Sequence, residues 1–249
     1  MSSTIRRTAI PFRWAHQPQP GVASARNAAL TLARGKYVAW LDDDEAAPPH
    51  WLAALVEMRA KTGAQSVFGP VRARAPDGAR HPHFFERLYG RIGPPHSGPV
   101  PNAFGIGNSL QPRAMFDEGF DPASDQSGGE DDRLFALWSE AGARYAWAED
   151  AWVVEHIDAR RTRLAYGFKR AFAYGQGPSA KAWRAKNLLA LARHMSIGFA
   201  QAFVFAPLSA ALLVASPKQA LTMLDRAVRG AGKVLWFLEQ RFYGLAQPN

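Results

Sequence analysis

The sequence predicts an α/β core over residues 1–160, followed by a basic helical region over residues 161–249. In the first region, short runs of apolar, aromatic and β-branched residues alternate with amphipathic segments, which is typical of alternating strands and helices. The second region has a helical pattern to its end. Charge divides near the same place, since residues 1–150 hold 16 Lys/Arg and 17 Asp/Glu, whereas residues 151–249 hold 14 and 4. The net charge of +9 is therefore a property of the second region.

Periodicity and turn residues place the elements of the first region. Small apolar residues recur on one face of a helix over 21–33, and the run KYVAWL at 36–41 is typical of a buried strand. Residues 75–104 hold six prolines, four glycines and three histidines, so we expect mostly loop there, and a loop this long is usually functional. The other expected elements are a helix over 49–62, strands over 66–74 and 104–110, a helix over 130–141, and a strand pair or one bent strand over 145–157.

From residue 162 the pattern is helical, with breaks expected at 175–178 and 216–217. Residues 195–217 form a stretch of 23 residues without a charge, and basic residues flank it on both sides. Such a stretch is long enough to span a bilayer. Its polar residues and Pro207 are equally compatible with a helix in the membrane surface, or with a soluble helix packed on the core. The basic flanks favour an anionic membrane surface as a partner.

Composition excludes several classes of site and partner. The chain has no cysteine, which excludes disulfides, thiolate catalysis and Cys-ligated metals. The positive net charge also suggests nucleic acid, but no nucleic-acid-binding motif is present and the basic residues are interleaved with apolar ones, so we expect no such partner. No apolar run follows Arg6 and Arg7, so the sequence predicts no secretory signal.

Two acidic clusters carry the chemical prediction. Asp42 to Asp44 directly follow the strand at 36–41, where carboxylates repel one another strongly and a divalent cation would remove the repulsion. Mg²⁺ or Mn²⁺ typically takes one or two protein carboxylates together with substrate phosphates. Glu130 to Asp132 follow two glycines at the start of a predicted helix, where one carboxylate could act as a general base. The alternative for both clusters is capping of the helix that follows.

In combination these motifs resemble glycosyltransferase family 2, whose members have the GT-A fold, and in particular the bacterial polysaccharide-synthesis transferases. Residues 21–30 (GVASARNAAL) and 33–45 (ARGKYVAWLDDDE) resemble the family pattern G-x-x-x-A-R-N-x-G/A-L, then A-x-G-x-[YF]-[LIV]-x-[FW]-L-D-[DS]-D. Residues 107–110 (GNSL) and 128–131 (GGED) resemble later family motifs, as does the segment from Glu155 to Gly175. The resemblance covers about residues 10–177.

The resemblance implies a role for each matching residue. Asp42, Asp43 and Asp44 form the donor-binding DxD motif, whose outer members Asp42 and Asp44 hold Mn²⁺ or Mg²⁺ on the diphosphate of a nucleotide sugar, expected to be a UDP-sugar. Asp131 matches the catalytic base that deprotonates the acceptor hydroxyl in an inverting transfer.

Four further residues receive weaker assignments. Arg26 lies in a motif near the donor site and could instead support the aspartates. Asn108 and Glu130 fall on the acceptor side. His156 is an additional candidate metal ligand, and the alternative for it is a histidine packed at a strand end.

We therefore expect a metal-dependent, inverting glycosyltransferase. It would act on a lipid-linked or polysaccharide acceptor at the cytoplasmic face of the bacterial inner membrane, bound peripherally or integrally through 195–217. Family members usually carry a further strand–helix–strand unit that binds the nucleobase, whereas only about 20 residues precede Gly21 here. We accordingly expect weak nucleotide binding by this polypeptide. The alternative function is a catalytically inactive, truncated glycosyltransferase-like protein associated with the membrane.

Overall fold

The computed structural model describes residues 11–125 and 129–238 of the 249-residue chain. Seven α-helices are described, namely α1 (Val22–Leu32), α2 (Trp51–Thr62), α3 (Pro82–Tyr89), α4 (Glu130–Glu140), α5 (Leu164–Arg184), α6 (Leu188–Leu212) and α7 (Pro217–Val234). The strands within these residues are β1 (Tyr37–Trp40), β2 (Glu45–Ala46), β3 (Ser66–Phe68), β4 (Val71–Arg74), β5 (Gly98–Val100), β6 (Ser109–Pro112), β7 (Tyr145–Trp147) and β8 (Val153–His156).

The strands form two mixed sheets. The larger has the order β1-β6-β3-β7-β5, in which only β3 and β7 pair in parallel. The smaller has the order β2-β8-β4, with β4 and β8 parallel. In three places the chain leaves the larger sheet and enters the smaller one, between β1 and β2, between β3 and β4, and between β7 and β8. These three crossings form a seam between the sheets.

Both faces of the larger sheet are covered, and its strands alternate accordingly. Val67 and Ala146 point to the face packed by α2, together with Leu55 and Met58. Phe68, Tyr145 and Trp147 point to the opposite face, which is packed by an aromatic cluster that includes Trp138 of α4. Because both faces are buried, β3 and β7 at the centre of this sheet are mostly apolar, whereas β6 also buries the polar side chains of Ser109 and Gln111.

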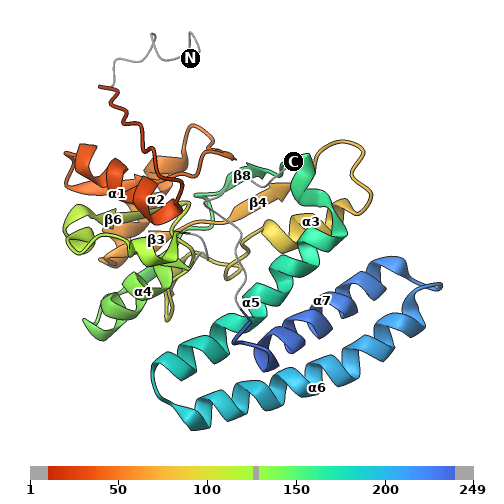
Figure 1. Ribbon diagram of the computed structural model, residues 1–249. Helices are drawn as coiled ribbons and strands as arrows, with labels where there is room; N and C mark the ends of the chain where they lie inside the picture. Colours follow the sequence, from red (N-terminus) through yellow and green to blue (C-terminus); the bar gives the residue numbers. More distant parts are fainter. Residues whose placement is uncertain (1–10, 126–128, 239–249) are drawn as a thin grey trace.

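The last three long helices form a separate layer. Figure 1 shows α5, α6 and α7 side by side, with α7 between the other two. The layer joins the core through α3, whose Phe84, Phe85 and Leu88 pack with Ala171 of α5 and with Leu221 and Val228 of α7. The domain boundary expected near residue 160 stays a prediction, since α5 begins at Leu164 and its packing continues into the core through α3.

Most predicted elements of the first region are present, but three expectations about strands and loops are wrong. The strand predicted over 104–110 begins only at Ser109 and continues to Pro112 as β6, so the residues before Ser109 are loop. The predicted strand at 66–74 is two strands, because the chain turns at Gly69 and Pro70 and passes from one sheet to the other. The predicted loop at 75–104 contains α3 and β5. Proline at the first helical position starts α3 rather than excluding it, and its four apolar side chains are all buried.

The expected break at 175–178 is also wrong, because α5 runs through it to Arg184 with Pro178 inside the helix. Gly175 allows α5 to pack closely on α7, since a Cβ at this position would collide with the backbone of α7 at Arg229. The chain turns instead at residues 185–187, where Lys186 has a φ of 53°. The break at 216–217 is confirmed.

Phe85 tests whether α3 anchors the helical layer. Its side chain is completely buried in that contact, so Phe85→Ala should lower the free energy of unfolding by about 3–5 kcal/mol in urea denaturation. Leu52→Ala removes an exposed apolar side chain of α2 and should change it by less than about 0.5 kcal/mol. Equal effects of the two variants would contradict the anchoring role.

Candidate functional site

The candidate site lies on the seam between the sheets, where β1 ends. Asp42 is the first residue of the acidic cluster to follow this strand, after Leu41. Its carboxylate lies against Gly107, so close that a Cβ at position 107 would collide with it. Gly107 belongs to the loop that leads into β6. The missing side chain at 107 therefore allows the first aspartate of the DxD motif to lie directly on this loop.

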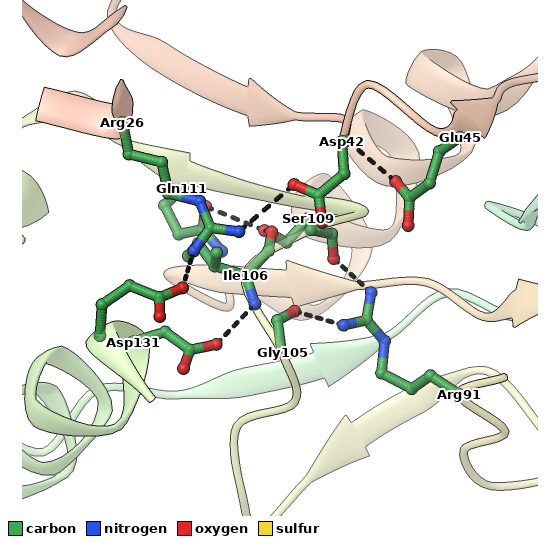
Figure 2. Close-up of polar contacts among 11 residues, drawn as sticks. Arg26, Asp42, Glu45, Arg91, Gly105, Ile106, Ser109, Gln111 and Asp131 are labelled. Carbon is green, nitrogen blue, oxygen red and sulfur yellow. Dashed lines mark hydrogen bonds and ion pairs between the residues drawn. The ribbon is translucent and has the colours of Figure 1, made fainter. Parts of the chain in front are cut away.

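Arg26 of α1 joins Asp42 to the second acidic cluster. One guanidinium nitrogen lies 3.3 Å from Asp42 Oδ1 (Figure 2), and another forms an ion pair with Glu130 at the start of α4. The side chains of Arg26 and Glu130 are only 13% and 8% exposed. Burial raises the pKa of Glu130, and the charge of Arg26 opposes that rise. Two acidic motifs far apart in the chain are thus joined by one arginine, which lies 104 residues before Glu130.

A second arginine holds the other outer aspartate of the DxD motif. Arg161 places Nη1 2.8 Å from Asp44 Oδ2 and Nη2 3.3 Å from Glu155 Oε1 on β8. Its guanidinium also lies over the ring of Tyr89, 4.5 Å from the centroid. Burial raises the pKa of Glu155 to about 6, although the positive charge of Arg161 acts in the opposite direction. Asp43, between the two outer aspartates, is exposed.

A third arginine, Arg91, fixes the loop over 105–107. It donates from Nη1 to the carbonyl of Gly105 at 2.7 Å and from Nη2 to the carbonyl of Gly107 (Figure 2). Its Nε lies 3.4 Å from the carbonyl of Gly69 at the turn between β3 and β4. The backbone of Arg91 pairs with Val71 of β4. Arg91 therefore ties this loop to both sheets at the seam.

The same loop also receives Asp131. The amide of Ile106 donates to Asp131 Oδ2 at 3.0 Å (Figure 2). Asp42 and Asp131 therefore contact neighbouring residues of one short loop, and the two acidic clusters predicted separately from the sequence meet there. Asp131 lies in the first turn of α4, where the helix dipole also favours a carboxylate. Its catalytic role stays a prediction, and Gly128 of the same motif lies outside the described residues.

Glu45 is a further acid of this site, and its pKa is raised. It accepts a hydrogen bond from the amide of Asp42 at 3.1 Å. Burial, followed by the negative charge of Asp42, raises the pKa of Glu45 to about 7. The guanidinium of Arg91 opposes this rise, and the same burial lowers the pKa of Arg91. The carboxylates and Arg91 are thus electrostatically coupled.

Asn108 and His156 have surroundings that differ from the expected roles. The Asn108 side chain is completely buried, accepts from Trp51 Nε1 at 2.7 Å, and donates to the carbonyls of Pro70 and Ala151 at 2.8 Å. In this position it holds the seam together, and it could affect an acceptor only through that backbone. His156 is exposed at the end of β8, and its amide donates to the carbonyl of Asp44 at 2.9 Å.

The donor set suits a hard divalent cation, but its members do not converge. Asp42 and Asp44 offer carboxylate oxygens, and their side chains are 43% and 34% exposed. Mg²⁺ and Mn²⁺ prefer such ligands and need only one or two of them when phosphate and water complete the coordination. Within residues 11–125 and 129–238, however, no group of three or more His, Asp or Glu side chains is arranged to hold a metal ion.

Two residues of the site could not be recognised from the sequence motifs. Arg91 lies in a segment rich in proline and glycine, and its partners are three backbone carbonyls, which leave no pattern in the sequence. Glu45 directly follows the three aspartates but is not part of the DxD pattern. Its burial could have been suspected, because it opens a short strand that pairs with β8.

Comparison with known proteins agrees with the sequence motifs. Residues 5–120 match the family model for glycosyl transferase family 2. The succinoglycan biosynthesis protein ExoM of Rhizobium meliloti (strain 1021) is 34% identical over 177 residues, which cover 68% of this chain and 56% of that protein. The chain thus spans just over half the length of this curated relative.

Two solved structures have a distant likeness. The structure of GalNAc-T7 with UDP, GalNAc and Mn²⁺ has a TM-score of 0.43 and 17% identity, over 65% of this chain and 38% of that one. The structure of S. aureus TarS residues 1–349 with UDP-GlcNAc has a TM-score of 0.40 and 14% identity, over 87% and 71%.

Glu45 offers a test of the electrostatics of this site. Because its pKa rises from 4.5 to about 7 on folding, the folded protein binds more protons than the unfolded chain between these values, and the free energy of unfolding falls as pH rises. Glu45→Gln removes this loss. Relative to wild type, the variant should therefore gain about 2 kcal/mol between pH 5 and pH 8 in urea denaturation.

Glu57→Gln is the control, since it removes an exposed carboxyl of α2 and should change stability by less than about 0.5 kcal/mol. A stability difference for Glu45→Gln that is the same at both pH values would contradict the raised pKa.

Proposed function

We propose that this chain, which has the GT-A type of α/β core with C-terminal helices and resembles the family 2 glycosyltransferases, is a sugar transferase. Its reaction would take place at the seam between the two sheets. The observation that carries the proposal is the meeting of the DxD aspartate Asp42 with Asp131 on the loop over 105–107. The relationship to a succinoglycan biosynthesis protein supports a role in making a bacterial polysaccharide.

The proposed reaction is an inverting transfer. Asp131 accepts the proton of the acceptor hydroxyl, the hydroxyl oxygen forms a bond to the anomeric carbon, and the bond from that carbon to the diphosphate oxygen breaks. The proton stays on Asp131 and the electron pair leaves with the nucleoside diphosphate. Glu130 is next to the proposed base in the sequence and is paired with Arg26. We propose that it lies on the acceptor side of the site.

The donor is proposed to be a nucleotide sugar, in particular a UDP-sugar, bound near Arg26 and the aspartates Asp42, Asp43 and Asp44. Mn²⁺ or Mg²⁺ held by Asp42 and Asp44, with His156 as a further candidate ligand, would offset the charge on the departing diphosphate. Because Asp42 and Asp44 already pair with Arg26 and Arg161, we expect these two arginines to change partners when a cation and a diphosphate bind.

The acceptor is proposed to be a lipid-linked sugar or a growing glycan at the cytoplasmic face of the bacterial inner membrane. One helix among the described residues, α6, is long and apolar enough to cross a membrane by length and composition. The basic second region would be attracted to anionic lipid. The chain would be bound to this membrane peripherally, or integrally through 195–217.

A second candidate function is a catalytically inactive relative that keeps the fold and the membrane association. The observation that favours it is the pairing of both outer aspartates of the DxD motif with arginines, which already neutralises them. The following experiment separates the two functions.

Asp131→Asn keeps the size of the side chain but removes the base. In transfer of radiolabelled sugar from UDP-sugars with Mn²⁺ to membrane lipid, this variant should lose about 10²- to 10⁴-fold in rate. Asp132→Asn makes the same change one residue along α4, on an exposed side chain, and should keep most of the rate. Equal rates of Asp131→Asn and wild type would exclude Asp131 as the base. Absence of transfer by wild type with every UDP-sugar tried would favour the inactive relative.

A further inference from the structure

The outer face of α6 is an unusually large exposed apolar surface. Its members are Leu189 (84% exposed), Phe199 (65%), Phe203 (73%), Val204 (53%), Leu208 (42%) and, just beyond the helix, Leu213 (59%) and Val214 (95%). No charged residue lies between Arg193 and Lys218. A soluble monomer rarely leaves so many large apolar side chains in water along one helix, so this face indicates a partner surface.

The inner face of α6 is closely packed on α7. Gly198 of α6 and Gly230 of α7 face each other, and a Cβ at either position would come within about 2.6 Å of the other helix's backbone. Further along, Ser209 is buried and donates to the carbonyl of Ala220 at 2.8 Å. The contact extends along the helix from Gly198 to Ser209, so α6 cannot change its surroundings without α7.

Helix α7 cannot lie at the depth of the hydrocarbon. It carries Lys218, Asp225, Arg226, Arg229 and Lys233 along its 18 residues. Charged side chains at the centre of a bilayer are costly, and five in one helix are incompatible with a lipid-exposed span. Because α7 packs alongside α6, an α6 that crossed the bilayer would carry these charges into it.

The middle of α7 is also tied to the core. Asp225 lies 3.0 Å from Arg229 Nε and 3.8 Å from Arg87 Nη2 on α3. Since α3 packs on the smaller sheet through residues such as Ala73, the midpoint of α7 stays with the water-soluble core. A spanning α6 would require this whole contact to open.

We propose that α6 lies in the plane of the membrane surface, with its outer face in the boundary between headgroups and hydrocarbon of an anionic bilayer and α7 on the aqueous side. The proposal builds on the membrane partner suggested above and does not depend on sugar transfer.

Charge supports this orientation and this partner. Lys186 and Arg193 border the apolar face near its start, and Lys218 borders its end, and all three are exposed. Arg226 of α7 is exposed, and its guanidinium lies over the ring of Phe205 of α6, 5.2 Å from the ring centroid. Basic residues around an apolar face are the pattern of a helix that binds anionic lipid in its interface.

The chain has no cysteine, so single cysteines can report the depth of α6 without background. We would place one at Leu189, Phe203 or Val214 on the outer face, label it with an environment-sensitive fluorophore, and add vesicles of phosphatidylcholine with or without phosphatidylglycerol. Lipids that carry a spin label at a shallow or a deep acyl position then quench the fluorophore according to its depth. A cysteine at Ile92, which is exposed and lies away from α6, is the matched control.

The proposal predicts shallow quenching of equal extent at all three outer positions, only with phosphatidylglycerol, and little quenching at position 92. Deep quenching at 203 with none at 189 and 214 would show a span and overturn the proposal. If the fluorescence at every labelled position is the same with and without lipid, the proposal is also overturned. This holds both for a monomer and for a dimer that pairs through α6.

A charge substitution gives an independent readout. Phe203→Glu should weaken flotation with phosphatidylglycerol vesicles by at least about tenfold, whereas Ile92→Glu, at an exposed apolar residue away from α6, should leave flotation unchanged. Equal flotation of the Phe203→Glu variant and wild type would also overturn the proposal. If the wild-type protein does not float with these vesicles but still transfers sugar to a soluble acceptor, only the docking mode is overturned and not the proposed enzyme.

Discussion

The structure depends on the compensation of negative charge at the seam between its two sheets. Acids from three separate segments are brought close together there, and burial raises the pKa values of Glu45 and Glu155 to about 7 and about 6. Carboxylates so close together would repel one another and open the seam. Arg26, Arg91 and Arg161, from three further places in the chain, prevent this. Arg91 matters most, because it also satisfies three backbone carbonyls where the chain passes between the sheets.

This arrangement explains how one small loop can serve two chemical roles. The loop over 105–107 is fixed on one side by Arg91, and on the other it receives Asp42 and Asp131. The separation between the proposed donor side and the proposed base is therefore set by backbone rather than by flexible side chains, which is the kind of rigid support that a reacting group needs. The helical layer is attached elsewhere, through α3, so its apolar face can meet a membrane without disturbing the seam.

The motifs at Asp42 to Asp44 and at Glu130 to Asp132 could be found in the sequence because carboxylates next to strand and helix ends have a recognisable pattern. The strand β1 and the helices α1, α2 and α4 were likewise predictable from short-range periodicity. The strand expected over 104–110 instead lies at Ser109–Pro112, because the residues before it form the loop that receives Asp42 and Asp131. The helix α3 was missed because prolines and glycines on both sides hid its apolar pattern, and the strand at 66–74 was taken as one because the turn at Gly69 depends on pairing with distant strands. Arg91 could not be predicted, since its partners are carbonyl groups that every residue possesses. The contact between α7 and α3, from which we infer that α6 does not span the membrane, is likewise a tertiary contact between residues far apart in the chain.

The most direct test of charge compensation at the seam is the stability of an Arg91→Met variant as a function of pH. At pH 5 both Glu45 and Glu155 are mostly protonated in the folded protein, so the variant should lose only the hydrogen bonds to the three carbonyls. At pH 8 both are ionised, and the loss in the free energy of unfolding should be greater by about 1–2 kcal/mol in urea denaturation. Arg144→Met is the control, because it also removes a guanidinium that donates to a glycine carbonyl, here that of Gly63 at 2.8 Å on the exposed surface. This variant should show no such increase. A loss for Arg91→Met that is the same at both pH values would contradict the central role of charge compensation.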